Sequence, residues 1–182
     1  MNLPESNNVH TLSLVTRDQP GVLVRIALVF ARRGRNIESL AVSPGATDGY
    51  ARMTITSSGN PETLTQILRQ LAKLVDVVDV IDHLENRPLE AEVALAKVDS
   101  SGIDVLALAK RLSARAETGR VDVIDQSDNV AVFRVMGETE EVERTIAALS
   151  EERTLQELVR SGPVAMDSGP SHYSHLMGKP LR

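Results

Sequence analysis

The sequence predicts an α+β protein made of two domains, each with four strands and two helices. Apolar residues alternate at every second position in some segments and recur every three to four positions in others, as expected for strands and amphipathic helices. Through residue 84 these segments run strand, helix, strand, strand, helix, strand, and the order recurs between residues 90 and 168 after a break at Asn86-Arg87-Pro88. This order is the ferredoxin-like βαββαβ arrangement, with both helices on one face of an antiparallel sheet.

Composition excludes several classes of function. The 182 residues carry a net charge of −5 and only 2% aromatic residues, whereas nucleic-acid binders show a basic stripe and stacking aromatics. Cysteine is absent, which excludes disulfides and thiolate metal sites. No apolar run is long enough for a membrane span, and the first residues lack the features of a signal peptide. We therefore expect a cytoplasmic protein without nucleic-acid or membrane partners.

The first predicted domain covers residues 9–84. Ala51, Met53 and Ile55 alternate with polar residues and should face inward, whereas Ile37 is out of phase with Leu40 and predicts a β-bulge near residues 38–39. The expected strands are 9–15, 36–43, 50–56 and 75–84, and the expected helices are 21–33 and a second one beginning at Asn60-Pro61.

The helix at 21–33 is unusually apolar. It lies between two turn sequences, Asp18-Gln19-Pro20-Gly21 and Gly34-Arg35-Asn36, and apolar residues fill positions 22–24 and 26–30. This stripe is wider than one sheet contact requires. We expect a second covering surface, provided by a homodimer partner or another subunit.

The second predicted domain covers residues 90–168, and a polar tail follows at 169–182. Its last strand is interrupted at Ser161-Gly162-Pro163. The expected strands are 91–98, 119–124, 130–136 and 155–166, and the expected helices are 104–116 and 138–149.

Five motifs carry a resemblance to a known family. They are DQPGVL at 18–23 with RGRNIESLAVSP at 33–44, ARMTI at 51–55, QLAKLVDVVDV at 70–80 and LVRSGPVAM at 158–166. The first half resembles an ACT domain, a βαββαβ module that binds amino acids. In order and spacing, the whole set resembles the regulatory (small) subunit of acetolactate synthase, also called acetohydroxyacid synthase, over residues 9–168.

The resemblance implies a subunit with no catalytic site and no cofactor of its own. In that family the catalytic subunit carries thiamine diphosphate, Mg²⁺ and FAD, and the small subunit activates it and confers feedback inhibition by branched-chain amino acids, chiefly valine. The effector lies between two ACT domains of a dimer. Carried over by motif, the effector-binding residues are Asp18 for the ammonium group, the backbone of Gly21, Val22 and Leu23 for the carboxylate, and Asn36 and Ile37 from the opposing subunit.

The chemistry of these residues suits a zwitterion, although each also has a simpler interpretation. Unpaired amides at a helix start attract a carboxylate, and Asp18 supplies an acceptor for an ammonium group. Gly21 also suits an ordinary turn, and Asp18 could cap that turn instead. Asn36 suits a helix end, and Arg25 could reach an effector carboxylate or simply extend into solvent.

The sequence departs from the family pattern near the end of the second domain. The family commonly has a basic residue before its closing glycine, whereas this chain has Asp167 and Ser168, which puts contacts of that domain in doubt. His172 and His175 have the spacing of a metal pair but lack a carboxylate or cysteine beside them, so we expect no metal. We expect His10 and His83 at the surface or at strand edges.

No motif indicates catalysis. The chain lacks a G-x-S-x-G, a phosphate-binding glycine loop and an H-E-x-x-H. Two alternatives to the regulatory subunit remain open: an independent ACT-domain sensor of another enzyme, and a small enzyme of unknown type. A regulatory subunit in valine, leucine and isoleucine biosynthesis agrees best with the ordered motifs.

Overall fold

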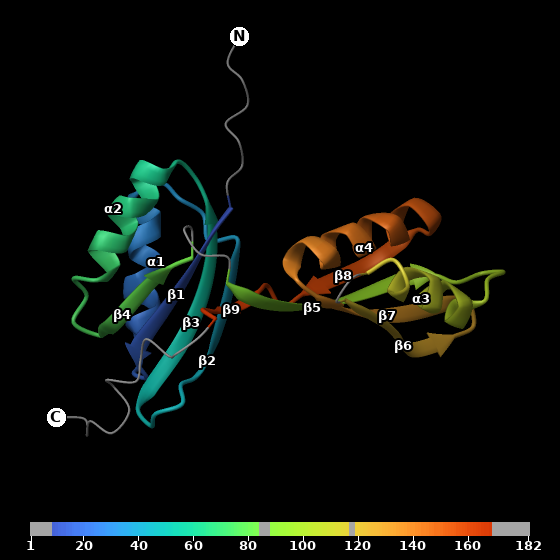
Figure 1. The fold of residues 1–182 in the computed structure, drawn as a ribbon, viewed down its shortest axis with the longest axis horizontal. Helices are drawn as coiled ribbons and strands as arrows, with labels where there is room; N and C mark the ends of the chain where they lie inside the picture. Colours follow the sequence, from blue (N-terminus) through green and yellow to red (C-terminus); the bar gives the residue numbers. More distant parts are fainter. Residues whose placement is uncertain (1–8, 84–87, 117–118, 169–182) are drawn as a thin grey trace, which may run out of the picture. The chain divides into compact units, whose positions relative to one another are not determined.

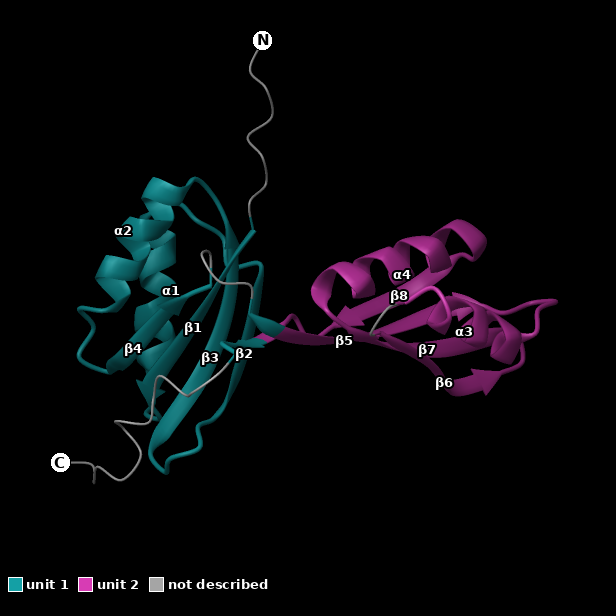
Figure 2. Ribbon diagram, viewed as in Figure 1, with its two compact units in different colours: residues 1–89, 165–182 teal, residues 90–164 magenta. Residues whose placement is uncertain are grey.

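The computed structural model describes residues 9–83, 88–116 and 119–168 (Figure 1). The described residues form two compact units, coloured separately in Figure 2. The second unit is residues 90–164, and the first contains the residues before it together with those from Ala165 onward. Residues 165–168, which we expected in the second domain, therefore group with the first unit.

The first unit has the predicted βαββαβ order. Its sheet is antiparallel with strand order β2-β3-β1-β4. The elements are β1 (Val9–Arg17), α1 (Val22–Arg32), β2 (Ser39–Pro44), β3 (Tyr50–Ser58), α2 (Pro61–Leu71) and β4 (Val77–Asp82).

One face of this sheet packs against both helices, which lie on the same side in Figure 1. Alternate side chains of a strand point to opposite faces, so Leu12 and Leu14 of β1 enter the core while Ser13 points away. The buried apolar side chains are Leu12, Leu14, Met53 and Ile55 from the sheet, Val22, Ile26, Val29 and Phe30 from α1, and Leu64, Ile67 and Leu71 from α2, with Val77 of β4. The predicted inward residues of β3 are confirmed.

The start of β2 corrects one prediction. β2 and β3 pair in an unbroken register from Ser39 opposite Thr56 to Pro44 opposite Ala51, so the bulge expected near residues 38–39 is wrong. Ile37 precedes the strand and packs against the core from there. Its phase is therefore not tied to the alternation of the strand.

The second unit repeats the same order, with a sheet arranged β6-β7-β5-β8. Asp104 caps its first helix by accepting a hydrogen bond from the backbone of Ala107 at 3.0 Å. The elements are β5 (Leu89–Asp99), α3 (Val105–Ser113), β6 (Arg120–Ser127), β7 (Val130–Gly137), α4 (Thr139–Glu152) and β8 (Leu155–Arg160), and a short strand, β9 (Val164–Met166), follows. The predicted interruption at residues 161–163 is confirmed, because it separates β8 from β9.

A partly buried ion pair joins β5 to β8 in this unit, and the side chain of its cation, Arg160, is 33% exposed. Arg160 donates from Nε and Nη2 to the two carboxylate oxygens of Glu92, at 2.7 and 2.9 Å. The Glu92 side chain is only 1% exposed. Hydrogen bonding to Glu92 raises the pKa of the Arg160 guanidinium, and burial partly opposes this rise.

The pair predicts a large loss of stability when its cation is removed. Arg160→Met should lower the free energy of unfolding of the second unit by on the order of 3 kcal/mol, because Glu92 would remain buried and uncompensated. Hydrogen exchange at increasing urea concentration measures the free energy of unfolding of each unit separately.

Lys97→Met is the matched control, since it removes a 2.6 Å pair with Glu157 between the same two strands. Both of those side chains are largely exposed, so the expected cost is below about 1 kcal/mol. Equal losses in the two variants would contradict the assignment.

Candidate functional site

The turn between β1 and α1 depends on the backbone conformation of Gly21. Its φ of 85° lies in the left-handed region, which glycine adopts without the steric cost of a Cβ atom. The turn is held to the neighbouring strand because the backbone N–H of Asp18 donates to the carbonyl of Gly49, at 2.9 Å. Residues 18–21 thus end β1 and start α1 in a fixed position.

Backbone amides in the first turn of α1 remain available. The N–H of Val22 makes one long bond of 3.4 Å to the carbonyl of Gln19, and those of Leu23 and Val24 have no acceptor among the described residues. Helix starts leave such donors unpaired and carry partial positive charge, which favours a bound anion. The side chain of Val22 is buried in the core, so Val22 can offer a ligand only its backbone, whereas Leu23 is 40% exposed.

The Asp18 carboxylate lies at the surface beside these amides. Within the described part of the chain it makes no side-chain hydrogen bond or ion pair, and the N-terminus of α1 has no side-chain cap. The alternative in which Asp18 caps its own turn is therefore not formed. An acceptor for a cation and donors for an anion lie side by side.

Arg25 has a partner that the sequence did not suggest. Its Nη2 lies 2.5 Å from Oδ2 of Asp76, a buried residue in the segment before β4. The carbonyl of Asp76 also accepts a hydrogen bond from the backbone of Arg17, at 2.8 Å. Arg25 thus fixes the first turn of α1 to the sheet rather than extending freely into solvent, and the 51 residues separating it from Asp76 explain why no local pattern indicated the pair.

The other end of α1 is a second turn. Gly34 takes a φ of 63° and ends the helix. Asn36 is exposed, and its backbone carbonyl accepts a 2.7 Å hydrogen bond from the Ser57 hydroxyl. Ile37 is half-buried against the core. The amide of Asn36 is therefore presented at the surface by an anchored backbone.

The predicted site residues fall into two separate groups. Asp18, Gly21, Val22 and Leu23 lie at the start of α1, and Asn36 and Ile37 follow its end. An α1 of 11 residues is about 16 Å long. The fold of one chain therefore does not bring the two groups together around a small ligand.

The buried histidines correct another prediction. His10 is 2% and His83 5% exposed, so the expectation that they lie at the surface or at strand edges is wrong. His10 points to the same face of β1 as Leu12, beneath the helices, and neither ring nitrogen has a hydrogen-bond partner among the described residues. Thr16, two residues before Asp18, is likewise buried with an unpaired hydroxyl. A polar residue within an apolar strand pattern was the available signal for both.

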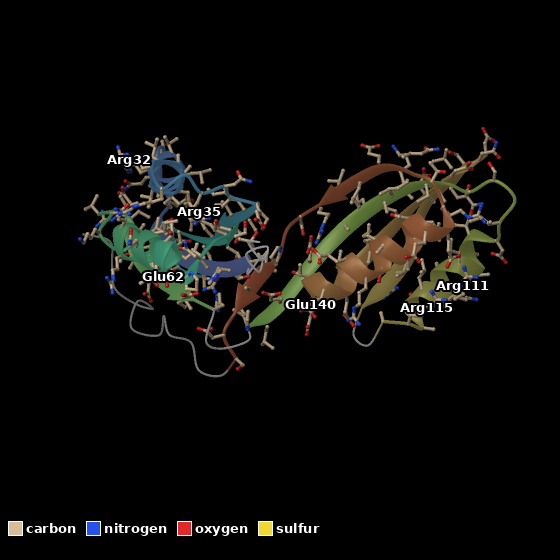
Figure 3. All side chains as sticks on the ribbon, turned by 90° about the horizontal axis from the view of Figure 1, so that it is seen from above. Arg32, Arg35, Glu62, Arg111, Arg115 and Glu140 are labelled. Carbon is tan, nitrogen blue, oxygen red and sulfur yellow. The ribbon has the colours of Figure 1, made fainter. Side chains whose placement is uncertain are left out.

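The second unit contains a cavity of about 160 Å³ between α3 and α4. Figure 3 labels Arg115, just after α3, and Glu140, in the first turn of α4. The cavity is lined by seven residues: Leu112, Arg115, Ala116, Glu141, Arg144, Thr145 and Ala148. This cavity contains none of the residues predicted to bind an effector.

The described residues contain neither a metal-binding cluster nor a membrane-spanning helix. Within residues 9–83, 88–116 and 119–168, no three His, Cys, Asp or Glu side chains gather in a way that could hold a metal ion. His172 and His175 lie outside the described residues. No helix in the same part of the chain is long and apolar enough to cross a membrane.

Comparison with known families matches both units. Residues 12–79 match the family described as the AHAS small subunit-like ACT domain, and residues 91–169 match the family described as the small subunit of acetolactate synthase.

Individual relatives match over nearly the whole chain. The acetolactate synthase small subunit of Haemophilus influenzae is 37% identical, covering 87% of this chain and 94% of the relative. That of Mycobacterium bovis is 35% identical, covering 91% and 95%. The crystal structure of the Thermotoga maritima small subunit superposes with a TM-score of 0.73 at 32% identity, covering 90% of this chain and 99% of that one. The chain therefore belongs to the acetolactate synthase small-subunit family, the regulatory subunits of that synthase.

Proposed function

We propose that this chain activates the catalytic subunit of an acetolactate synthase and makes it sensitive to feedback inhibition by a branched-chain amino acid, with valine as the first candidate. Membership of the small-subunit family supports a catalytic subunit as partner. The proposal places thiamine diphosphate, Mg²⁺ and FAD in that catalytic subunit and both subunits in the cytoplasm.

Recognition of the amino acid rests on the turn before α1. The ligand carboxylate binds the backbone amides of Leu23 and Val24, and the ammonium group binds Asp18. Charge-assisted hydrogen bonds of this kind are about twice as strong as neutral ones. The exposed Leu23 supplies apolar contact for an aliphatic side chain.

The length of α1 is the observation that carries the proposal. One valine is much shorter than the roughly 16 Å that an 11-residue helix spans, so it cannot touch both groups of site residues in one chain. Two chains related by a two-fold axis solve this problem, because the start of α1 in one chain then faces Asn36 and Ile37 of the other. A two-fold contact of this kind uses the same surface on both chains.

The surface that such a dimer requires is present in the first unit. β2 is an edge strand of the sheet, and α2 packs along β4 at the opposite edge. Leu23, Val24 and Leu28 expose 40–62% of their surface on α1, and Val42 of β2 exposes 48% on the helix-covered side. In the proposed homodimer these side chains form an apolar contact beside the site.

Inhibition follows from thermodynamic linkage. An effector that binds one conformation of the complex more tightly draws the complex toward that conformation. Binding of the catalytic subunit must then change the affinity of this chain for the effector by a certain factor. Binding of the effector must change the affinity of this chain for the catalytic subunit by the same factor.

The first prediction tests the function directly. The purified chain, added to its cognate catalytic subunit, should raise acetolactate formation several-fold, and valine should then inhibit it. The measurement is the rate of acetolactate formation with and without this chain at increasing valine. A chain that neither activates nor confers inhibition would show that it regulates another enzyme.

The second prediction concerns the turn. Gly21→Asp places a carboxylate where the ligand carboxylate binds, so the valine concentration for half-inhibition should rise at least tenfold while activation is largely retained. The rate of acetolactate formation against valine concentration measures both effects.

Gly102→Asp is the matched control for backbone strain. Gly102 lies in the second unit at a φ of 69°, with open space around it, so the same change strains the backbone without approaching the site. If Gly102→Asp desensitises the enzyme as strongly as Gly21→Asp, the turn is not the binding site.

The third prediction tests whether two chains share the pocket. Asn36→Ala removes one hydrogen bond to a charged group, worth about 1.5 kcal/mol at such an exposed position, so valine affinity should fall about tenfold. Mixed dimers of Gly21→Asp and Asn36→Ala chains should recover one intact site, because each chain supplies the half that the other lacks.

Calorimetric titration of co-refolded mixtures with valine measures this recovery. About half of the chains should enter mixed dimers, each with one site of native affinity. Asn129→Ala, at an exposed turn of the second unit, is the control and should bind valine like the unaltered chain. No recovery on mixing would place the whole pocket within one chain.

A further inference from the structure

Residues 165–167 lie on the helix-free face of the first sheet. Ala165 is 5% exposed and contacts side chains of β1 and β3 that point away from the core. Ser13 and Thr54 stand opposite each other in the β1–β3 register, so they form adjacent positions on that face. We call the contacts of residues 165–167 with Ser13, Arg52, Thr54 and His83 the clasp.

The backbone of Ala165 is held by three hydrogen bonds. Its carbonyl accepts from Nη2 of Arg52 at 2.9 Å and from the hydroxyl of Ser13 at 3.3 Å, and its N–H donates to the hydroxyl of Thr54 at 3.4 Å. Ser13 and Thr54 are buried beneath the segment. Losing the segment would therefore expose polar groups that are now paired.

His83 closes the clasp from the end of β4. Its Nε2 lies 2.8 Å from the Ser13 hydroxyl and its Nδ1 lies 3.0 Å from a carboxylate oxygen of Asp167. The arrangement resembles a nucleophile, base and acid, but Ser13 is fully buried and no substrate could reach it. The network is structural, and the aspartate that departs from the family pattern is one of its members.

The clasp joins the two points at which the chain leaves and re-enters the first unit. His83 precedes the second unit in the sequence, and Asp167 follows it. The 83 intervening residues are thus closed into a loop by non-covalent contacts, and closing a loop of this length costs conformational entropy. Opening the clasp would break these hydrogen bonds and regain that entropy, so the two effects oppose each other.

Both strands that hold Ala165 also adjoin the turn before α1, β1 through the chain and β3 through a hydrogen bond. From Ser13, β1 continues to its last residue, Arg17, and the turn follows at Asp18. β3 begins at Tyr50, and the carbonyl of Gly49 just before it accepts the hydrogen bond from Asp18. A change in the turn is therefore applied directly to the two strands that position the clasp.

We propose that the clasp couples the effector turn to the second unit by controlling where the chain re-enters the first unit. This inference rests on the proposed function, since it assigns the route by which the bound amino acid acts. Physical coupling requires a two-state element that both sites bias, and the clasp fills that role in this proposal.

Two variants open the clasp, and one serine provides the control. Ser13→Ala removes the central hydroxyl, and Asp167→Asn removes the charge beside His83 at a partly exposed position where folding is not at risk. Ser39→Ala is matched to Ser13→Ala, because Ser39 lies on the same face of the same sheet and bonds Thr56 rather than the clasp.

Hydrogen exchange of the full chain tests the clasp itself. The Ala165 amide should exchange at least tenfold faster in Ser13→Ala and Asp167→Asn, and within twofold of the unaltered rate in Ser39→Ala. Unchanged exchange in both clasp variants would overturn the clasp.

Acetolactate formation with the cognate catalytic subunit tests the coupling. In both clasp variants the isolated chain should bind valine within about twofold of the unaltered affinity, while maximal inhibition falls to less than half. Faster exchange with undiminished inhibition would overturn the coupling and leave the clasp as a structural contact. If the unaltered chain itself confers no valine inhibition, the proposed function fails and the coupling with it, whereas the exchange rates still decide whether the clasp forms.

Discussion

The arrangement of the first unit depends on α1, which holds two turns apart. The eleven residues of α1 lie between Gly21 and the turn that presents Asn36. Val22, Ile26, Val29 and Phe30 fix the helix to the sheet. The helix cannot bend or shorten without opening that core. Under the proposed function, a site that uses both turns is therefore incomplete in a single chain, and dimerisation is a condition for binding.

The ends of α1 could be predicted from sequence because each depends on local chemistry. Gly21 immediately before the helix and Gly34 just after it both adopt the left-handed region, where glycine is favoured. The order of strands and helices along the chain, the inward residues of β3 and the cap at Asn60 are equally local. Alternation and spacing suffice for such features.

Contacts between distant segments could not be predicted in this way. The pair of Arg25 with Asp76 and that of His83 with Asp167 each join segments that are neighbours only after folding. His83 was therefore expected at a surface that the returning chain in fact covers. The bulge near residues 38–39 failed for the opposite reason, since alternation was extended to Ile37, which lies outside the strand.

The helix-free faces of the two sheets differ in how deeply their polar groups are buried. On the second sheet, Asp122 accepts hydrogen bonds from Arg134 and Arg120, which lower the pKa of its carboxyl group, and these groups remain accessible to water. Such exposed pairs contribute little to stability and leave the face unchanged when a neighbour moves. On the first sheet, the corresponding face buries Ser13 and Thr54 beneath a segment that returns from the other unit. Buried polar groups lose much more when their partners leave. The stability of the first sheet therefore depends on the position of that segment, and β1 and β3 of this sheet adjoin the turn beside Asp18.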